Sequence, residues 1–271
     1  MLRSIRPRLF RAVAGLWLFS SLAMAQQDLI YLEKGRFEPV DLVGGSLEIV
    51  LLDLDLANGV IEFDLLNQST EPITAWQIRL ITIFEDDRRI WEDVLGDYIQ
   101  SANRARPDPL PKYHSTASPL WPQQSRHHRR TLGRNPDAAI AKVQVIARGV
   151  AFRDSEMLGV PSATAYIRDR RIGELKALNS WISRIDGVAG NSGFDSVLAL
   201  KQQVDSTKSD YGAINNAQKA GVAAALSSIT ADLKELVSKG PSQAEYGLTS
   251  LWSSLKRAQQ ALRDGLRLKQ R

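Results

Sequence analysis

The 271-residue chain contains no cysteine and only three histidines. Without cysteine no disulfide framework can stabilise the fold, so stability must come from an apolar core. All three histidines, His114, His127 and His128, lie in a proline-rich basic stretch where we expect an exposed loop. They lack the converging spacing of a tetrahedral metal site. Because none of them lies on an expected helix or strand, a Ser-His-Asp triad would also lack a positioned base. Glycine-rich phosphate loops are also missing, so nucleotide binding has no support.

Long hydrophobic runs are missing after the N-terminus. The chain begins MLRSIRPRLFRAVAGLWLFSSLAMAQQ, in which four arginines precede an apolar stretch that is too short to span a bilayer. Ala23-Met24-Ala25 then matches the cleavage motif of a secretory signal peptide. We therefore expect residues 1–25 to be removed and the protein to be exported, to the periplasm or the medium. No later window holds about 18 uninterrupted apolar residues, so the mature chain should not be transmembrane.

Charge is segregated along the chain rather than in excess. The formal net charge is +5, and it falls to +1 once the four arginines of the signal peptide are removed. Residues 26–100 carry a net charge of −11, whereas residues 101–136 and residues 137–271 each carry +6. Because nucleic-acid binding needs a clustered basic surface, the overall basicity gives no reason to expect it.

Residues 46–154 have the two-residue periodicity of β-strands. The segment LLDLDLANGVIEFDLL, residues 51–66, places Asn58-Gly59 between alternating apolar runs, which predicts a hairpin with a two-residue turn. In that register one face is apolar, while on the other Asp55 lies opposite Glu62 and Asp53 opposite Asp64. The segments ITAWQIRLITIF and AIAKVQVIARGVAFRD predict further strands. In the first of them Trp76, Ile78 and Leu80 share a face that should be buried.

These strands resemble bacterial immunoglobulin- or fibronectin-type modules. The stretch VIEFDLLNQSTEPITAWQIRLITIFEDDRR is similar to the middle of such modules, with an N-x-S/T-x-x-P-I turn before a strand that carries a buried aromatic residue. VIARGVAFRDSEMLG resembles their closing strand and turn, although the usual Asp-Gly is Asp154-Ser155 here. The resemblance covers residues 46–155. It implies an antiparallel β-sandwich and no particular activity.

Beyond Pro161 the periodicity becomes helical. Apolar stripes predict helices over residues 162–186, 195–208, 216–238 and 242–266, separated by short glycine-containing links. Such links favour antiparallel neighbours. The expected architecture is therefore an immunoglobulin- or fibronectin-like β-sandwich at 26–158, with a proline-rich basic insert at 101–136, followed by a small antiparallel α-helical bundle at 159–271.

Four carboxylates on one face of the hairpin need an explanation, since like charges opposite each other are unfavourable. The face of Asp53, Asp55, Glu62 and Asp64 could simply be solvated. The basic insert could fold back over it, because arginine suits carboxylates. An external cation such as Ca²⁺, or a basic partner, is the third explanation, although a flat ribbon rarely supplies six to eight converging oxygens. Of the last two we favour the insert.

The leading functional hypothesis is a non-enzymatic binding or scaffold protein of the bacterial envelope, without a cofactor. Its partner would be an envelope protein, and its last helix could also contact an anionic membrane surface. The alternative is a hydrolase that acts on an envelope or extracellular polymer through the hairpin carboxylates or Glu85, Asp86 and Asp87. The candidate partner-binding residues are the basic residues of the last helix: Lys256, Arg257, Arg263, Arg267, Lys269 and Arg271.

Overall fold

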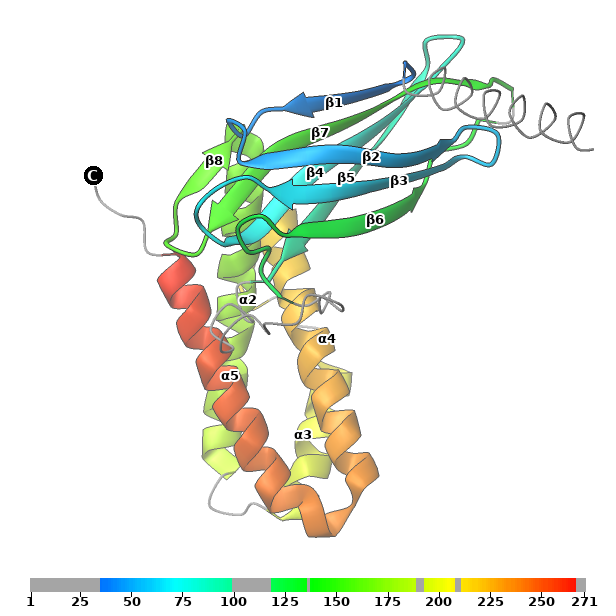
Figure 1. Cartoon of the computed structure of the whole chain (residues 1–271). Helices are drawn as coiled ribbons and strands as arrows, with labels where there is room; N and C mark the ends of the chain where they lie inside the picture. The colour runs from blue at the N-terminus through cyan, green and yellow to red at the C-terminus, as the bar shows by residue number, and fades with distance from the viewer. Residues whose placement is uncertain (1–34, 99–117, 136, 189–192, 208–210, 267–271) are drawn as a thin grey trace, which may run out of the picture.

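Two mostly antiparallel sheets and four long helices make up the described part of the chain (Figure 1). The computed structural model describes residues 35–98, 118–135, 137–188, 193–207 and 211–266, so the expected signal peptide lies outside it. The strands are β1 (Phe37–Asp41), β2 (Leu47–Asp55), β3 (Val60–Asn67), β4 (Ile73–Phe84), β5 (Arg89–Asp97), β6 (Ser125–Thr131), β7 (Ile140–Phe152) and β8 (Met157–Gly159). The helices are α2 (Pro161–Val188), α3 (Phe194–Ser206), α4 (Asn216–Lys239) and α5 (Ala244–Leu266), with a 3₁₀ turn at Pro241–Gln243. The predicted order, strands and then helices, is confirmed.

One apolar core joins the two sheets. The first sheet has the order β1-β7-β4-β5, with β8 beside β7, and the second has the order β2-β3-β6. Trp76, Ile78 and Leu80 of β4 are buried together with Phe63 of β3, as the alternation of β4 predicts. The pair β1–β7 is parallel, whereas the expected architecture is antiparallel throughout.

The predicted β2–β3 hairpin forms, but in a different register. The turn spans four residues, 56–59, because the Asp55 carboxylate accepts hydrogen bonds from the backbone and side-chain nitrogens of Asn58, at 2.9 and 2.6 Å. Asp55 therefore lies opposite Val60, and Asp53 lies opposite Glu62. The register shifts again between Leu51 and Asp53, which leaves Leu52 exposed. The two predicted carboxylate pairs are wrong.

Helix α2 belongs to both parts of the molecule. Its first half covers the outer face of the larger sheet, where Ile167 packs against Ala75 and Ala151. Its second half contributes Leu178, Trp181 and other residues to a separate core shared with α3, α4 and α5. Because only the first half of α2 lies on the sheet, the helices extend away from the sheets, as Figure 1 shows.

Helices α2 and α4 cross with their backbones in contact. A Cβ atom added to Gly173 would lie 2.0 Å from the carbonyl oxygen of Gln218, and one added to Gly221 would lie 1.9 Å from that of Arg170. Both distances are far below van der Waals contact, so only glycine fits at these positions. Around them, Asp169 of α2 accepts a hydrogen bond of 2.8 Å from Asn215, the N-cap of α4.

We predict that Gly221→Ala destabilises the protein by about 2–3 kcal/mol, because the added methyl group forces the two helices apart. Gly187→Ala in α2 is the matched control: a Cβ there meets nothing within 4 Å. It should be neutral, or stabilising by about 0.5–1 kcal/mol from the helix propensity of alanine. Urea unfolding measures both, and equal effects of the two substitutions would contradict the crossing.

Candidate functional site

Strand β6 places an arginine and a histidine beside the carboxylates of the acidic face. In the register of β3 and β6, Glu62 lies opposite Arg129 and Asp64 opposite His127. Arg129 Nε is 3.3 Å from Glu62 Oε1, and His127 Nδ1 is 3.3 Å from Asp64 Oδ1. Part of the basic segment thus folds back on the hairpin as expected, but it does so as an edge strand. The prediction that His127 and His128 lie in an exposed loop is wrong.

The opposite face of β6 points into the molecule. Because strand residues alternate between faces, Arg126, His128 and Arg130 lie on the same side as the buried residues of β3. The guanidinium of Arg126 packs 4.1 Å above the ring of Tyr98, and its Nη2 donates to the carbonyl of Ser118. We call these three residues the inner basic strip.

His128 is held in an apolar environment within this strip. Its ring stacks on Phe63 with a centroid distance of 5.4 Å and meets Trp76 edge-on at 5.0 Å. Burial, followed by the positive charges of Arg130 and Arg126, lowers the pKa of His128 from 6.5 to about 4. The imidazole is therefore neutral at physiological pH, and so low a pKa is poorly matched to proton transfer there.

Several polar atoms around the strip are buried without a hydrogen-bond partner among the described residues. They are Trp76 Nε1, Arg126 Nη1, His128 Nε2 and Arg130 Nε. The indole and guanidinium nitrogens are donors, so they can donate hydrogen bonds to a water molecule or to another acceptor group. The sequence shows the basic residues but not this arrangement, since it depends on which face of β6 turns inward.

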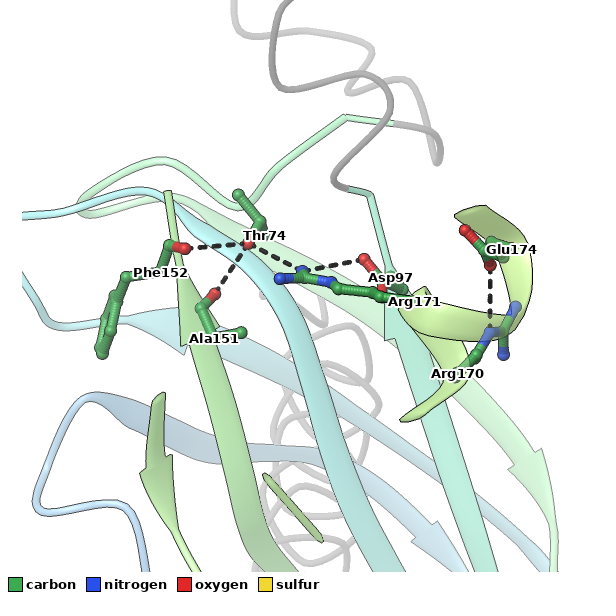
Figure 2. A network of polar contacts seen from close by, with 7 residues as sticks. All are labelled: Thr74, Asp97, Ala151, Phe152, Arg170, Arg171 and Glu174. Carbon is green, nitrogen blue, oxygen red and sulfur yellow. Dashed lines mark hydrogen bonds and ion pairs between the residues drawn. The ribbon is translucent and has the colours of Figure 1, made fainter. Parts of the chain in front are cut away.

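A second polar cluster fastens α2 to the sheet (Figure 2). Arg171 donates from Nε and Nη2 to the two carboxylate oxygens of Asp97, at 2.9 and 3.0 Å, and from Nη2 to the Thr74 hydroxyl at 3.0 Å. Thr74 in turn donates to the carbonyl of Ala151 at 3.0 Å. The side chains of Arg171 and Asp97 are 0 % and 2 % exposed. We call Arg171, Asp97 and Thr74 the Arg171 latch.

Sequence reasoning missed the latch, although one signal pointed to it. Arg171 lies four residues after Ile167 and seven before Leu178, so it shares the buried face of the helix. A charged residue on that face requires a buried partner. Acidic residues of the strands are therefore the candidate partners of Arg171, but nothing in the sequence selects Asp97 among them.

The basic residues proposed on the last helix differ in their surroundings. Lys256 Nζ lies 3.9 Å from Asp186 and 5.1 Å from the centre of the Trp252 ring, so it is engaged within the helices. Arg257 and Arg263 are exposed on α5. Arg267, Lys269 and Arg271 lie outside the described residues.

The remaining acidic candidates are dispersed. Asp53 accepts from the backbone of Leu54, and Asp55, the last residue of β2, accepts from Asn58 of the hairpin turn. Glu85, Asp86 and Asp87 are exposed between β4 and β5, where a hydrogen bond from Arg88 lowers the pKa of Asp86. Within the described ranges no three histidine or acidic residues form a group that could hold a metal ion, whether Ca²⁺ or another. None of the helices described is long and apolar enough to cross a membrane.

Comparison of the chain with protein-family models, with curated proteins and with solved structures finds no match in any of the three.

The latch predicts a large energetic coupling between Arg171 and Asp97. Arg171→Met removes the ion-pair partner of the buried Asp97 carboxylate and should cost about 3–5 kcal/mol. The double variant Arg171→Met/Asp97→Asn should recover about 2–3 kcal/mol of the summed losses. The exposed pair Arg88–Asp86 serves as a control, for which we expect additivity. Chemical unfolding of each set gives the coupling, and additive losses at Arg171 and Asp97 would refute the latch.

His128 predicts a pH dependence of stability. Its folded pKa of about 4 lies below the unfolded value of 6.5, so between these values the unfolded chain binds a proton that the folded chain does not. The free energy of unfolding should therefore be highest above pH 6.5 and fall by about 1–2 kcal/mol towards pH 4, after allowance for the partial exposure of the ring.

His128→Phe should remove this fall, while His127→Gln should retain it. Unfolding free energies at pH 7 and pH 4.5 measure the effect. An unchanged pH dependence in His128→Phe would show that other groups cause it.

Proposed function

We propose that this protein is an exported, non-enzymatic binding or scaffold protein of the bacterial envelope. In this proposal the β part is an immunoglobulin- or fibronectin-type sandwich forming one domain, and the helices form a second that carries the interaction surface. The observation that carries it is the Arg171 latch, which fixes α2 on the sheet and so holds the helices in one orientation. A scaffold needs such rigidity, whereas a flexible tether would not bury an ion pair.

Export is supported by the N-terminal sequence alone. The basic residues, the short apolar stretch and Ala23-Met24-Ala25 occur in the order of a signal peptide. The absence of cysteine is compatible with an oxidising compartment, because the mature chain is long enough to form the two apolar cores described above.

The interaction surface that we propose is the outer face of α5. Its leucines, among them Leu248, Leu255 and Leu262, are buried in the helical core, so α5 must keep a fixed orientation. Arg257 and Arg263 consequently point to solvent. Two outward guanidinium groups on a fixed helix suit an acidic partner protein of the envelope.

The hydrolase alternative has weaker support. A polymer hydrolase needs a pair of carboxyl groups with separated pKa values. Here the hydrogen bonds from Asn58 lower the pKa of Asp55, and Arg88 does the same to Asp86. Both acids are thereby kept ionised, which does not suit a general acid.

The test is crosslinking within the envelope, with the full-length chain as bait. Removal of α5 is unsuitable because its leucines belong to the core. We instead compare wild type with Arg257→Glu/Arg263→Glu, and use Lys219→Glu/Lys234→Glu on exposed positions of α4 as the matched control.

We predict a specific partner that wild type and the α4 control capture and that the α5 variant captures at least about tenfold less. Equal capture by all three would exclude the α5 surface. If no protein is captured and the α5 variant loses binding to anionic vesicles that wild type binds, the partner is the membrane. Turnover of an envelope polymer that disappears with Asp55→Asn would favour the hydrolase.

A further inference from the structure

A cavity of about 750 Å³ opens at the end of the sheets opposite α2. It lies beside Ile140, the first residue of β7, whereas the chain turns towards β8 and α2 after Phe152, the last residue of that strand. The β2–β3 turn, Arg36 just before β1, and residues 134–135 and 138–139 between β6 and β7 form its walls. Its volume is in the range of small-molecule sites.

The cavity combines an apolar interior with two cationic groups. Phe84, Ile140 and Leu56 supply the apolar surface, and Arg36 and Arg134 supply the guanidinium groups. The two arginines come from different walls, since Arg36 precedes β1 and Arg134 follows β6. Neither has an ion-pair partner among the described residues. Arg134 donates to a neutral group, the carbonyl of Asn58, at 2.7 Å.

A further donor is also available in the lining. Asn135 accepts from the backbone of Asp137 through Oδ1 at 3.2 Å, but its Nδ2 is buried and has no hydrogen-bond partner in the described part of the chain. Asp55, the acid of the adjoining turn, already accepts two hydrogen bonds from Asn58. Asp55 stays ionised but forms no ion pair with Arg36 or Arg134 among the described residues.

We propose that this cavity binds a single-chain amphipathic anion, an acyl chain that ends in a carboxylate. The chain occupies the apolar interior beside Phe84 and Ile140. The carboxylate accepts charge-assisted hydrogen bonds from Arg36 and Arg134 and a further bond from Asn135. A neutral or cationic amphiphile lacks these bonds and leaves the two guanidinium groups unpaired. This ligand site goes beyond the proposed scaffold function and shares none of the α5 residues.

The test is calorimetric titration of the full mature chain with dodecanoate below its micellar concentration. We expect saturable binding at one site, and binding of dodecyltrimethylammonium, which has the same tail and the opposite charge, at least about tenfold weaker. Arg36→Gln/Arg134→Gln should weaken dodecanoate binding at least about tenfold. Arg129→Gln, a change of the same kind on the outer face of β6, should leave it unaltered.

Ala139→Trp provides a second test of the site. Ala139 is an exposed residue of the cavity wall, so a tryptophan there narrows the cavity while both arginines remain. It should abolish binding without altering the fold, as judged by circular dichroism. Lack of saturable binding, equal affinity for the cationic amphiphile, or unaltered binding in Ala139→Trp would each overturn the proposal. Partner capture through Arg257 and Arg263 is measured separately, so either proposal can fail alone.

Discussion

The ion pair between Arg171 and Asp97 is the constraint on which the arrangement of sheets and helices depends. Removing both charges from water is costly, and the two parallel hydrogen bonds and the contact with Thr74 offset that cost. Helix α2 therefore cannot slide or rotate on the sheet without leaving a buried charge unpaired. Two residues further along α2, Gly173 is in backbone contact with α4, so the position of α2 also fixes the position of α4. The latch thus carries the geometry of the sheet into the helices.

Strand β6 lies beside the acidic face of β3, and its residues alternate between the two faces of the sheet. Its outward residues, His127 and Arg129, meet the carboxylates of β3, while its inward residues reach the aromatic core. A basic segment that was only a cover for the acidic face would place all its arginines outward. The structure divides them instead, and the inward group keeps His128 neutral through burial and nearby positive charge. One strand consequently lowers the repulsion on the surface and introduces polar groups into the interior.

The fold could be predicted from the sequence wherever the pattern was local and periodic. The alternation of β4 identified Trp76 and Ile78 as buried, and the apolar stripes located the helices to within a few residues. Prediction failed where a side chain or a distant segment decided the result. The Asp55 carboxylate selected a four-residue turn over the two-residue turn that Asn58-Gly59 favours. The latch and the end cavity join segments far apart in the chain, and no local pattern encodes such pairings.

Ser155 is a strained residue in the turn between β7 and β8. This serine adopts φ 77°, a conformation that favours glycine, at a cost of about 1–2 kcal/mol. Its hydroxyl donates to the carbonyl of Asp264 in the last turns of α5, a contact that glycine could not make. The strained residue thus provides a second connection between the sheets and the helices, in addition to the Arg171 latch. Because α5 is tied to the sheet here and to α2 through the leucine core, its exposed arginines have a fixed position relative to the strands. A surface held at both places is suited to binding a partner without first having to become ordered.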